Sequence, residues 1–269
     1  LPENIAYLGP EGSFTHQAAE SRFGAMSAYQ PLASIKGVFR EVKRNKAKFG
    51  VVPVENSSNG IVNDTIHCLN KYDLKIIAEV IVDVHFAFAS SCQHVRDIKK
   101  IYSKDIAFEQ CHKFLDDFAL DEIEHIPVES TAKAAKLALE NPNSAAICSH
   151  VGAKMYNLPI MFENIEDKHN NKTRFFIVSN FENASSGNDK TSILAKLPNT
   201  PGALVEFLTD FDNAGINLTK IKSHIVEGDS IFFIDFSGHK DDENVKTIFT
   251  KHESSIKFLG SYVKEVDDI

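Results

Sequence analysis

One apolar segment constrains the fold of this chain more than any other feature. Residues Leu74 to Ser90 (LKIIAEVIVDVHFAFAS) have an extended character, but they are too many for one ordinary strand. Strand-like and helix-like patterns alternate on both sides of this segment, which is typical of an α/β architecture. Its simplest role is to cross from one α/β lobe to another, with a later segment crossing back. Two lobes joined in this way enclose a cleft, where small ligands bind preferentially.

The residues before this segment predict the first lobe. NIAYLG reads as a buried strand. It is followed by the GPEGS turn and then by a helix through FTHQAAESRFG. The helix SIKGVFREVKRNKA places Ile35, Val38, Phe39 and Val42 on one face, and FGVVPVE is again strand-like. After the segment, KKIYS, EIEHIPV and AAICS are predicted strands, separated by the predicted helices FEQCHKFLDDFAL and STAKAAKLALEN.

The composition changes after NASSGNDK, which is typical of a flexible linker. The rest of the chain predicts strand, helix, strand, strand, helix, strand, the βαββαβ order of a ferredoxin-like unit. Pro201 near the start of the first of these helices and Gly215 beyond its end mark its limits. We therefore expect a two-lobed domain over residues 1–182, a linker over 183–189 and a ferredoxin-like domain over 190–269.

Composition argues against several classes of protein. The 269 residues have a formal net charge of −8, whereas broad nucleic-acid binding needs a basic surface. No apolar run reaches the length of a membrane helix, and no signal-peptide pattern opens the chain. The chain begins with Leu1 rather than methionine, which is typical of a processed product or of a piece of a longer protein.

The cysteines and histidines show no metal-binding pattern. The four cysteines are widely spaced and lie in apolar or helical contexts, so we expect buried free thiols in a reducing cytoplasm. They are Cys68, Cys92, Cys111 and Cys148. The 11 histidines form no HxH or HExxH motif, and no GxSxG, Walker or GxGxxG motif is present. This leaves a site without metal or organic cofactor, rich in hydroxyls, amides and one arginine.

Five polar clusters stand at junctions between predicted elements. Each of the first four has a structural explanation, such as helix capping or a turn, and a functional one, the binding of a polar or anionic ligand. They contain Ser13; Glu55, Asn56 and Ser57; Ser103 and Gln110; and Glu129, Ser130 and Thr131.

The fifth cluster is HNNKTRFFIVSN, in which Thr173 and Arg174 stand where a loop becomes a buried strand. A buried cation needs a partner. That partner is either an acidic residue of the protein or a ligand carboxylate, which would accept two hydrogen bonds from the guanidinium. The sequence leaves both explanations open.

The clusters, taken in order, resemble those of the prephenate dehydratase family, and the last segment resembles an ACT regulatory domain. The matching stretches span nearly the whole chain. They are GPEGSFTHQAA, VVPVENSSNG, IYS with EQC, ESTAKAA, AAICSHVGAKMYNL, NNKTRFFIVS and PGALVEFL.

The resemblance implies a two-lobed fold like that of type II periplasmic binding proteins, with the active site in the cleft between the lobes. It also implies conversion of prephenate to phenylpyruvate, water and carbon dioxide in phenylalanine biosynthesis. A strand returning from the other lobe can run antiparallel, which would bring its first residues to the ligand-binding edge of the sheet.

The same resemblance implies roles for individual residues. Thr173 would donate a hydrogen bond or proton to the leaving hydroxyl, and Arg174 would anchor a carboxylate. Glu55 is expected to be catalytic with them, and Phe175 would pack beside the ring. The remaining residues expected to contact the substrate are Ser13, Asn56, Ser57, Ser103, Gln110, Glu129, Ser130, Thr131 and Asn171.

The ACT resemblance implies feedback inhibition by L-phenylalanine in a homodimer or homotetramer. The chain departs from the family's pattern at Lys104 and Asp105, where His-Pro is frequent. It also departs in the ACT segment, where Lys222, Ser223, His224 and Ile225 replace the family's Glu-Ser-Arg-Pro signature. The residues expected at the effector site are Gly202, Ala203, Leu204, Val205, Lys222, Ser223 and His224.

Three alternatives stay open. Arogenate carries an amino group where prephenate has a keto oxygen, and the motifs distinguish these substrates poorly. A solute-binding or amino-acid-sensing protein could use the same cleft without turnover. A chorismate mutase could precede Leu1 in a longer bifunctional protein.

Overall fold

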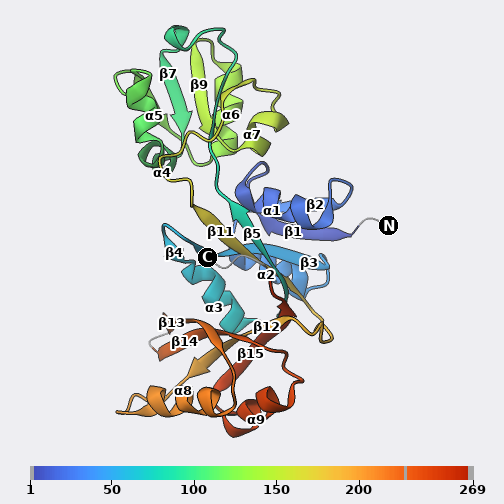
Figure 1. Cartoon of the computed structure of the whole chain (residues 1–269). Helices are drawn as coiled ribbons and strands as arrows, with labels where there is room; N and C mark the ends of the chain where they lie inside the picture. The colour runs from blue at the N-terminus through green and yellow to red at the C-terminus, as the bar shows by residue number, and fades with distance from the viewer. Residues whose placement is uncertain (1–2, 227–228, 266–269) are drawn as a thin grey trace.

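The computed structural model describes residues 3–226 and 229–265, and its strands form three separate sheets. Figure 1 shows the sheets following one another along an elongated molecule, with the first lobe between the second lobe and the C-terminal domain. This arrangement confirms the predicted two-lobed α/β region followed by a βαββαβ domain.

The first lobe is built on a mixed sheet with the order β2-β1-β3-β11-β5, and β4 pairs with the end of β3. β1 is parallel to β2 and β3, whereas β11 is antiparallel to β3 and β5. The predicted apolar face of α2 is confirmed, because all four of its expected residues are buried. The strands are β1 (Asn4–Leu8), β2 (Ala28–Leu32), β3 (Phe49–Asn56), β4 (Gly60–Ile61), β5 (Lys75–Asp83) and β11 (Lys172–Ser179). The helices are α1 (Phe14–Phe23), α2 (Ile35–Lys43) and α3 (Asn63–Lys71).

The second lobe has a sheet with the order β10-β6-β9-β7-β8. Its strands are β6 (Ala87–Ser90), β7 (Lys100–Ser103), β8 (Glu124–Pro127), β9 (Ser144–Cys148) and β10 (Ile160–Phe162). Its helices are the 3-10 turn η1 (Val95–Asp97), α4 (Asp105–Gln110), α5 (His112–Asp117), α6 (Thr131–Glu140) and α7 (His150–Met155).

The helix predicted over FEQCHKFLDDFAL is broken at Cys111 into α4 and α5. The carbonyl oxygen of Gln110 accepts a hydrogen bond from Asp167 N (2.7 Å) instead of continuing the helix. The Asp167 carboxylate in turn accepts from Lys113 N (3.0 Å). A distant segment of the chain therefore divides a helix that looks continuous in sequence.

The long apolar segment crosses between the lobes as predicted. It supplies β5 to the first sheet and β6 to the second, and residues 163–171 cross back from β10 to β11. The two crossings are tied together, since Val84 N donates to Asn171 O (2.7 Å) and Ile165 N donates to Phe86 O (3.1 Å). The buried Glu166 accepts from Phe86 N (2.9 Å) as well.

The C-terminal domain has the predicted element order and a sheet with the order β13-β14-β12-β15. α8 and α9 lie together on the side of this sheet that is remote from the lobes (Figure 1). Gly202 precedes α8 in a left-handed conformation (φ 87°), which glycine adopts readily. The elements are β12 (Asp189–Lys196), α8 (Ala203–Asn213), β13 (Leu218–Val226), β14 (Asp229–Ser237), α9 (Glu243–Lys251) and β15 (Ile256–Val263).

The first lobe and the C-terminal domain share one hydrophobic core. Phe176 and Ile76 of the first sheet are buried in the same cluster as Phe233 and Leu259 of the C-terminal sheet. β15 approaches β5 so closely that a Cβ on Gly260 would lie 2.1 Å from the carbonyl oxygen of Ile76. Only a residue without a side chain fits at this contact.

The segment expected to be a flexible linker is held by hydrogen bonds. Asn183 Nδ2 donates to Ile77 O (2.7 Å) and to Ser261 O (3.1 Å), so it joins the two domains. Ser186 Oγ donates to Asp189 Oδ1 (2.7 Å). Small polar residues, which suggest mobility in sequence, here provide the hydrogen bonds of a fixed turn.

The four cysteines are free, as predicted, and three of them are buried. Among the helices of the described residues, none combines the length and the apolar character that crossing a membrane requires.

Candidate active site

A cavity of about 450 Å³ lies between the two lobes. β1 and β3 are parallel and end at this edge of the first sheet, and the antiparallel β11 begins there. The second lobe contributes the start of α6 and residues around α4. Nine of the residues expected in the site line the cavity: Ser13, Asn56, Gln110, Glu129, Ser130, Thr131, Asn171, Thr173 and Phe175.

The Thr173 hydroxyl has a fixed hydrogen-bonding role. Asn56 Oδ1 accepts hydrogen bonds from the backbone amides of Ser58 (2.9 Å) and Asn59 (3.1 Å), which fixes the orientation of the Asn56 amide. Asn56 Nδ2 therefore faces Thr173 Oγ1 and donates to it at 2.8 Å. Because its oxygen already accepts this hydrogen bond, the Thr173 hydroxyl can direct its own hydrogen at a ligand.

Asn171 connects this pair to the second lobe. Its Oδ1 accepts from Asn56 Nδ2 (2.9 Å) and Ser57 Oγ (3.3 Å), and its Nδ2 donates to Gln110 Oε1 (3.4 Å) across the cavity. Ser57 does not line the cavity. Its Oγ accepts from Lys172 N (2.9 Å), so Ser57 holds the loop that leads into β11.

Two helices from different lobes begin at the cavity. Ser13 caps α1 by accepting from His16 N (3.3 Å), and Ser130 caps α6 by accepting from Lys133 N (3.1 Å). The capping explanation is thus confirmed for both serines, although both also line the cavity. Helix N-termini carry partial positive charge and unpaired amides, so this pair of ends favours an anionic ligand.

The lobes touch beside the cavity. Ser149 Oγ, at the start of α7, donates to Gly12 O in the loop before α1 (2.7 Å). A Cβ on Gly12 would lie 3.2 Å from the Cβ of Ala132 on α6 and 3.2 Å from the Cα of Gly152. Glycine at this position, together with its left-handed φ of 79°, lets the first loop lie against the second lobe.

The apolar wall of the cavity was only partly predicted. Phe175 was expected there, but Phe14 and Phe86 also line the cavity, with their rings edge to face at 5.7 Å between centroids. Phe86 belongs to the crossing segment. A segment that crosses between two lobes must border the cleft between them. The position of Phe86 in the crossing segment could therefore have placed it at the cavity.

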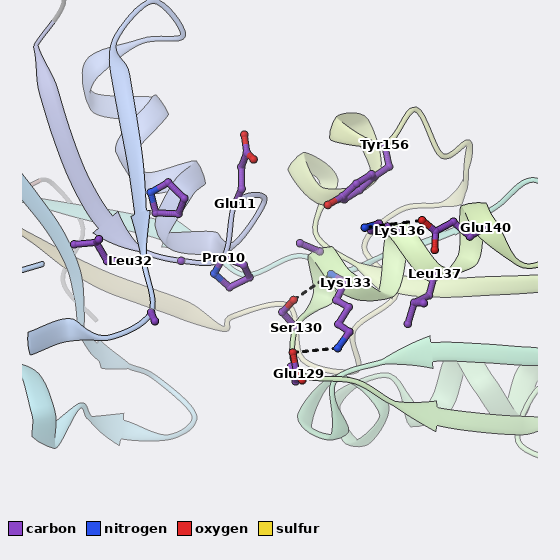
Figure 2. Close-up of a pocket in the computed structure, with 14 residues that line it drawn as sticks. Pro10, Glu11, Leu32, Glu129, Ser130, Lys133, Lys136, Leu137, Glu140 and Tyr156 are labelled. Carbon is purple, nitrogen blue, oxygen red and sulfur yellow. Dashed lines mark hydrogen bonds and ion pairs between the residues drawn. The ribbon is translucent and has the colours of Figure 1, made fainter. Parts of the chain in front are cut away.

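A second hollow of about 680 Å³ adjoins the cavity, between the first loop and α6. Figure 2 shows Pro10 and Glu11 on one side of it and Lys133 and Lys136 on the other. Both lysines form ion pairs with residues four positions away in the sequence: Lys133 with Glu129 (3.1 Å) and Lys136 with Glu140 (4.0 Å). Glu129 therefore points its carboxylate at Lys133 (Figure 2).

Arg174 lies outside the cavity, which corrects the expectation that it anchors a substrate carboxylate. Successive side chains of a strand point to opposite faces, so Arg174 leaves β11 on the face opposite Thr173. Its guanidinium donates to Glu79 Oε2 (2.7 Å), Asp235 Oδ2 (2.6 Å) and the Tyr262 hydroxyl (2.8 Å), and only 2% of its surface is exposed. Burial alone would lower the pKa of Arg174, but its oxygen partners, Asp235 foremost, raise that pKa well above its ordinary value. Of the two explanations left open by the sequence, the structure supports pairing within the protein.

Glu55 and Ser103 also face away from the cavity, contrary to expectation. Glu55 is paired with Arg174 in the register of β3 and β11 and is buried. Its carboxylate accepts a hydrogen bond from Lys220 of the C-terminal domain. Ser103 is fully buried, and its Oγ donates to Ile147 O (2.8 Å), which joins β7 to β9. Both residues stabilise the walls around the site.

The residues expected at the effector site lie on the C-terminal domain. Lys222, Ser223 and His224 belong to β13, the edge strand of the sheet, and Gly202 to Val205 form the start of α8. Val205 is 69% exposed, and Lys222 and Ser223 are exposed as well. Among residues 3–226 and 229–265, no three histidine, cysteine, aspartate or glutamate side chains form a group that could hold a metal ion.

Known proteins match both parts of the chain. The family model described as prephenate dehydratase matches residues 5–183, and the ACT domain model matches residues 191–253. The bifunctional chorismate mutase/prephenate dehydratase of Aquifex aeolicus is 40% identical over 266 residues, covering 97% of this chain and 73% of that protein. The prephenate dehydratase of Methanocaldococcus jannaschii is 34% identical over 271 residues, covering 96% of this chain and 97% of that protein.

The fold is similar to that of solved relatives. The crystal structure of prephenate dehydratase from Arthrobacter aurescens in complex with L-Phe matches with a TM-score of 0.87 and 33% sequence identity, covering 97% of this chain and 89% of that one. The family model covers more than half of the chain, and its matched residues include the strands that form the cavity. The chain therefore belongs to the prephenate dehydratase family and has a C-terminal ACT domain.

Proposed function

We propose that the cavity between the lobes is where the chain converts prephenate to phenylpyruvate, water and carbon dioxide, the reaction of a carbon–oxygen lyase. The observation that carries this proposal is the orientation of the Thr173 hydroxyl, which Asn56 fixes as a hydrogen-bond donor to a ligand. Thr173 and Asn56 meet because β11 returns antiparallel to β3.

The residues suit this chemistry. The bond from the ring to its hydroxyl breaks, and the oxygen leaves as water after gaining a proton. The bond from the ring to its carboxylate also breaks, and its electron pair enters the ring as carbon dioxide departs. Formation of the aromatic ring supplies the driving force, so the protein must mainly hold a dianion in one pose and assist departure of the hydroxyl group.

Thr173 would assist at the leaving oxygen. A threonine hydroxyl is too weak an acid to lose its proton unaided, so we assign it a hydrogen bond to the departing oxygen rather than sole responsibility for the proton. Assistance of this kind typically contributes roughly 100- to 10,000-fold to the rate. The hydrogen bond from Asn56 Nδ2 increases the donor strength of the hydroxyl.

The helix ends would hold the substrate. α1 and α6 direct their N-terminal amides at the cavity from opposite lobes, and each has a serine at its cap. A dianion held between the two helix ends would draw the lobes together and exclude water from the ring. Phe14, Phe86 and Phe175 would contact the ring itself.

An ultraviolet assay for phenylpyruvate tests the proposal. The purified chain should produce phenylpyruvate from prephenate, and arogenate run in parallel tests the amino-containing alternative through the formation of phenylalanine. Binding of prephenate without turnover would instead indicate a sensing or solute-binding role for the cleft.

We infer that L-phenylalanine inhibits the enzyme through the ACT domain. The relative from Arthrobacter aurescens was solved in complex with L-Phe, which supports this assignment. The coupling would be of the usual size, about 1–3 kcal/mol. Phenylalanine titrated into the wild type and into a Gly202→Val variant provides the test. An unchanged rate in the wild type at millimolar phenylalanine would end the feedback proposal.

We also propose a homodimer or homotetramer that resides in the cytoplasm. β13 is an edge strand, and an unpaired edge can join the same edge of a second copy. Light scattering of the purified chain measures the oligomeric state, and cell fractionation measures the location. A monomer at micromolar concentration would contradict the proposed assembly.

A further inference from the structure

The cavity needs a cation that the sequence motifs do not supply. Prephenate is a dianion, and the arginine expected to bind it is buried against Glu79 and Asp235 on the other face of the sheet. We propose, on the basis of the function proposed above, that Lys104 is the cation that binds the pyruvyl carboxylate of the substrate.

Lys104 is well placed for this role. It lies between the end of β7 and the start of α4 and is the one lysine or arginine among the described residues that line the cavity. The preceding residue, Ser103, is fully buried and bonded to β9, so the backbone that carries Lys104 is fixed. The Lys104 side chain is exposed, which leaves its ammonium free to reach a ligand.

The charge of Lys104 is also uncompensated. Among the described residues, no carboxylate forms an ion pair with its ammonium. Lys133 and Lys136, which line the adjoining hollow, are by contrast paired with Glu129 and Glu140 (Figure 2). An unpaired lysine at the rim of a cavity that must hold a dianion provides the missing attraction at little desolvation cost.

The chemistry decides which carboxylate Lys104 binds. The ring carboxylate loses its charge as carbon dioxide forms, so a cation bound to it would stabilise the starting state and slow the reaction. The pyruvyl carboxylate keeps its charge from substrate to product. A cation bound there stabilises substrate and transition state equally, and its loss should therefore raise KM and leave kcat nearly unchanged.

The proposal is tested by steady-state kinetics of Lys104→Met, Lys104→Arg and the control Lys136→Met. We expect Lys104→Met to raise KM for prephenate roughly 10- to 100-fold, as loss of one charge-assisted hydrogen bond does, with kcat within about threefold of wild type. Lys104→Arg should recover most of the affinity. Lys136→Met removes a lysine of the adjoining hollow that is already ion-paired, so its KM should stay close to that of the wild type.

Product inhibition identifies the carboxylate. Phenylpyruvate retains only the pyruvyl carboxylate, so its inhibition constant should rise in Lys104→Met by the same factor as KM. A KM within twofold of wild type would overturn the role of Lys104 even if the wild type converts prephenate efficiently. A raised KM with an unchanged phenylpyruvate inhibition constant would overturn the assignment to the pyruvyl group.

Salt dependence provides a measurement that a purely structural role would not change. Attraction between an exposed ammonium and a carboxylate weakens as ions screen it. The wild type should therefore lose kcat/KM more steeply than Lys104→Met between 25 and 250 mM salt. Equal slopes for the two proteins would contradict a direct charge contact.

Discussion

Thr173 and Arg174 are consecutive residues of β11, yet their side chains belong to different parts of the molecule. The Thr173 hydroxyl lies at the cavity and accepts a hydrogen bond from Asn56, whereas the Arg174 guanidinium contacts Asp235 of the ACT domain at 2.6 Å. Any change in how the ACT domain holds Arg174 therefore acts on the residue next to Thr173, which lines the cavity.

The contact at Arg174 is part of a buried polar network. Glu79 accepts from both Arg174 and Lys190, so it joins a strand of the first lobe to β12 of the ACT domain. Asp235 also accepts from Ser192 Oγ. The positive charges of Arg174 and Lys190 balance the negative charges of Glu79 and Asp235 where the domains meet. This balance allows the four charged groups to be buried together.

Replacing Arg174 should destabilise the protein rather than weaken substrate binding. Arg174→Met would leave Glu79 and Asp235 short of a cation in a buried site, and breaking such a pair costs about 3–5 kcal/mol. Urea unfolding of wild type and variant measures this loss. A stable Arg174→Met protein with a greatly raised KM would restore the role of carboxylate anchor to Arg174.

Removing the Thr173 hydroxyl should slow turnover without loss of binding. We expect Thr173→Ala to lower kcat by roughly 100-fold or more and Thr173→Ser to recover much of the rate, because serine keeps the donor. The inhibition constant of phenylpyruvate, which lacks the leaving hydroxyl, should stay nearly constant. Full activity of Thr173→Ala would remove Thr173 from the mechanism.

Gly260 should be essential for the contact between the domains. In Gly260→Ala the new Cβ would overlap the carbonyl of Ile76, and forcing extra atoms into a packed contact typically costs about 1–3 kcal/mol. Thermal unfolding measures the loss, and hydrogen exchange at residues 75–78 reports whether β5 and β15 separate.

Gly187→Ala is the matched control for this variant. Gly260 (φ 154°) and Gly187 (φ 85°) both have a positive φ, but a Cβ on Gly187 would meet no atom within 4 Å. This variant therefore tests backbone strain alone. Equal losses in the two variants would show that strain, and not the domain contact, explains the effect at Gly260.

Glu166 should make stability depend on pH at the crossings between the lobes. Burial alone would raise the pKa of Glu166, but hydrogen bonds from His85 (2.6 Å) and Phe86 N (2.9 Å) outweigh it and lower that pKa below its ordinary value. Below about pH 5 the unfolded chain therefore takes up this proton before the folded chain does, and stability falls with acidification through the lowered pKa.

The variant Glu166→Gln isolates this contribution. It should be less stable than wild type at pH 7, and the difference should shrink as the pH falls from 6 towards 3. Urea midpoints at successive pH values provide the measurement. A difference that stays constant over this range would show that the Glu166 carboxylate does not contribute through its ionisation.

The sequence by itself determined the order of the elements and identified nine of the residues that line the cavity between the lobes. Leu74–Ser90 is apolar over more residues than one strand contains, so the sequence predicts that it crosses between two sheets. The βαββαβ order follows from the local pattern of apolar and polar residues. Residues at or just beyond the ends of the parallel strands of the first sheet, such as Asn56 and Ser13, could be placed near one cavity, because those strands end at one edge of the sheet.

Only the tertiary structure decided what Arg174, Glu55 and Lys104 face. Arg174 and Asp235 are 61 residues apart, and Glu55 and Lys220 are 165 apart, so no local pattern shows that these charges meet. Residues of the ACT domain pair with both groups on the face of the sheet opposite the cavity. Among the described residues that line the cavity, Lys104 is the one lysine or arginine, and it has no ion pair. Periodicity reveals which residues are buried, but the partner of a buried charge depends on how separate domains pack.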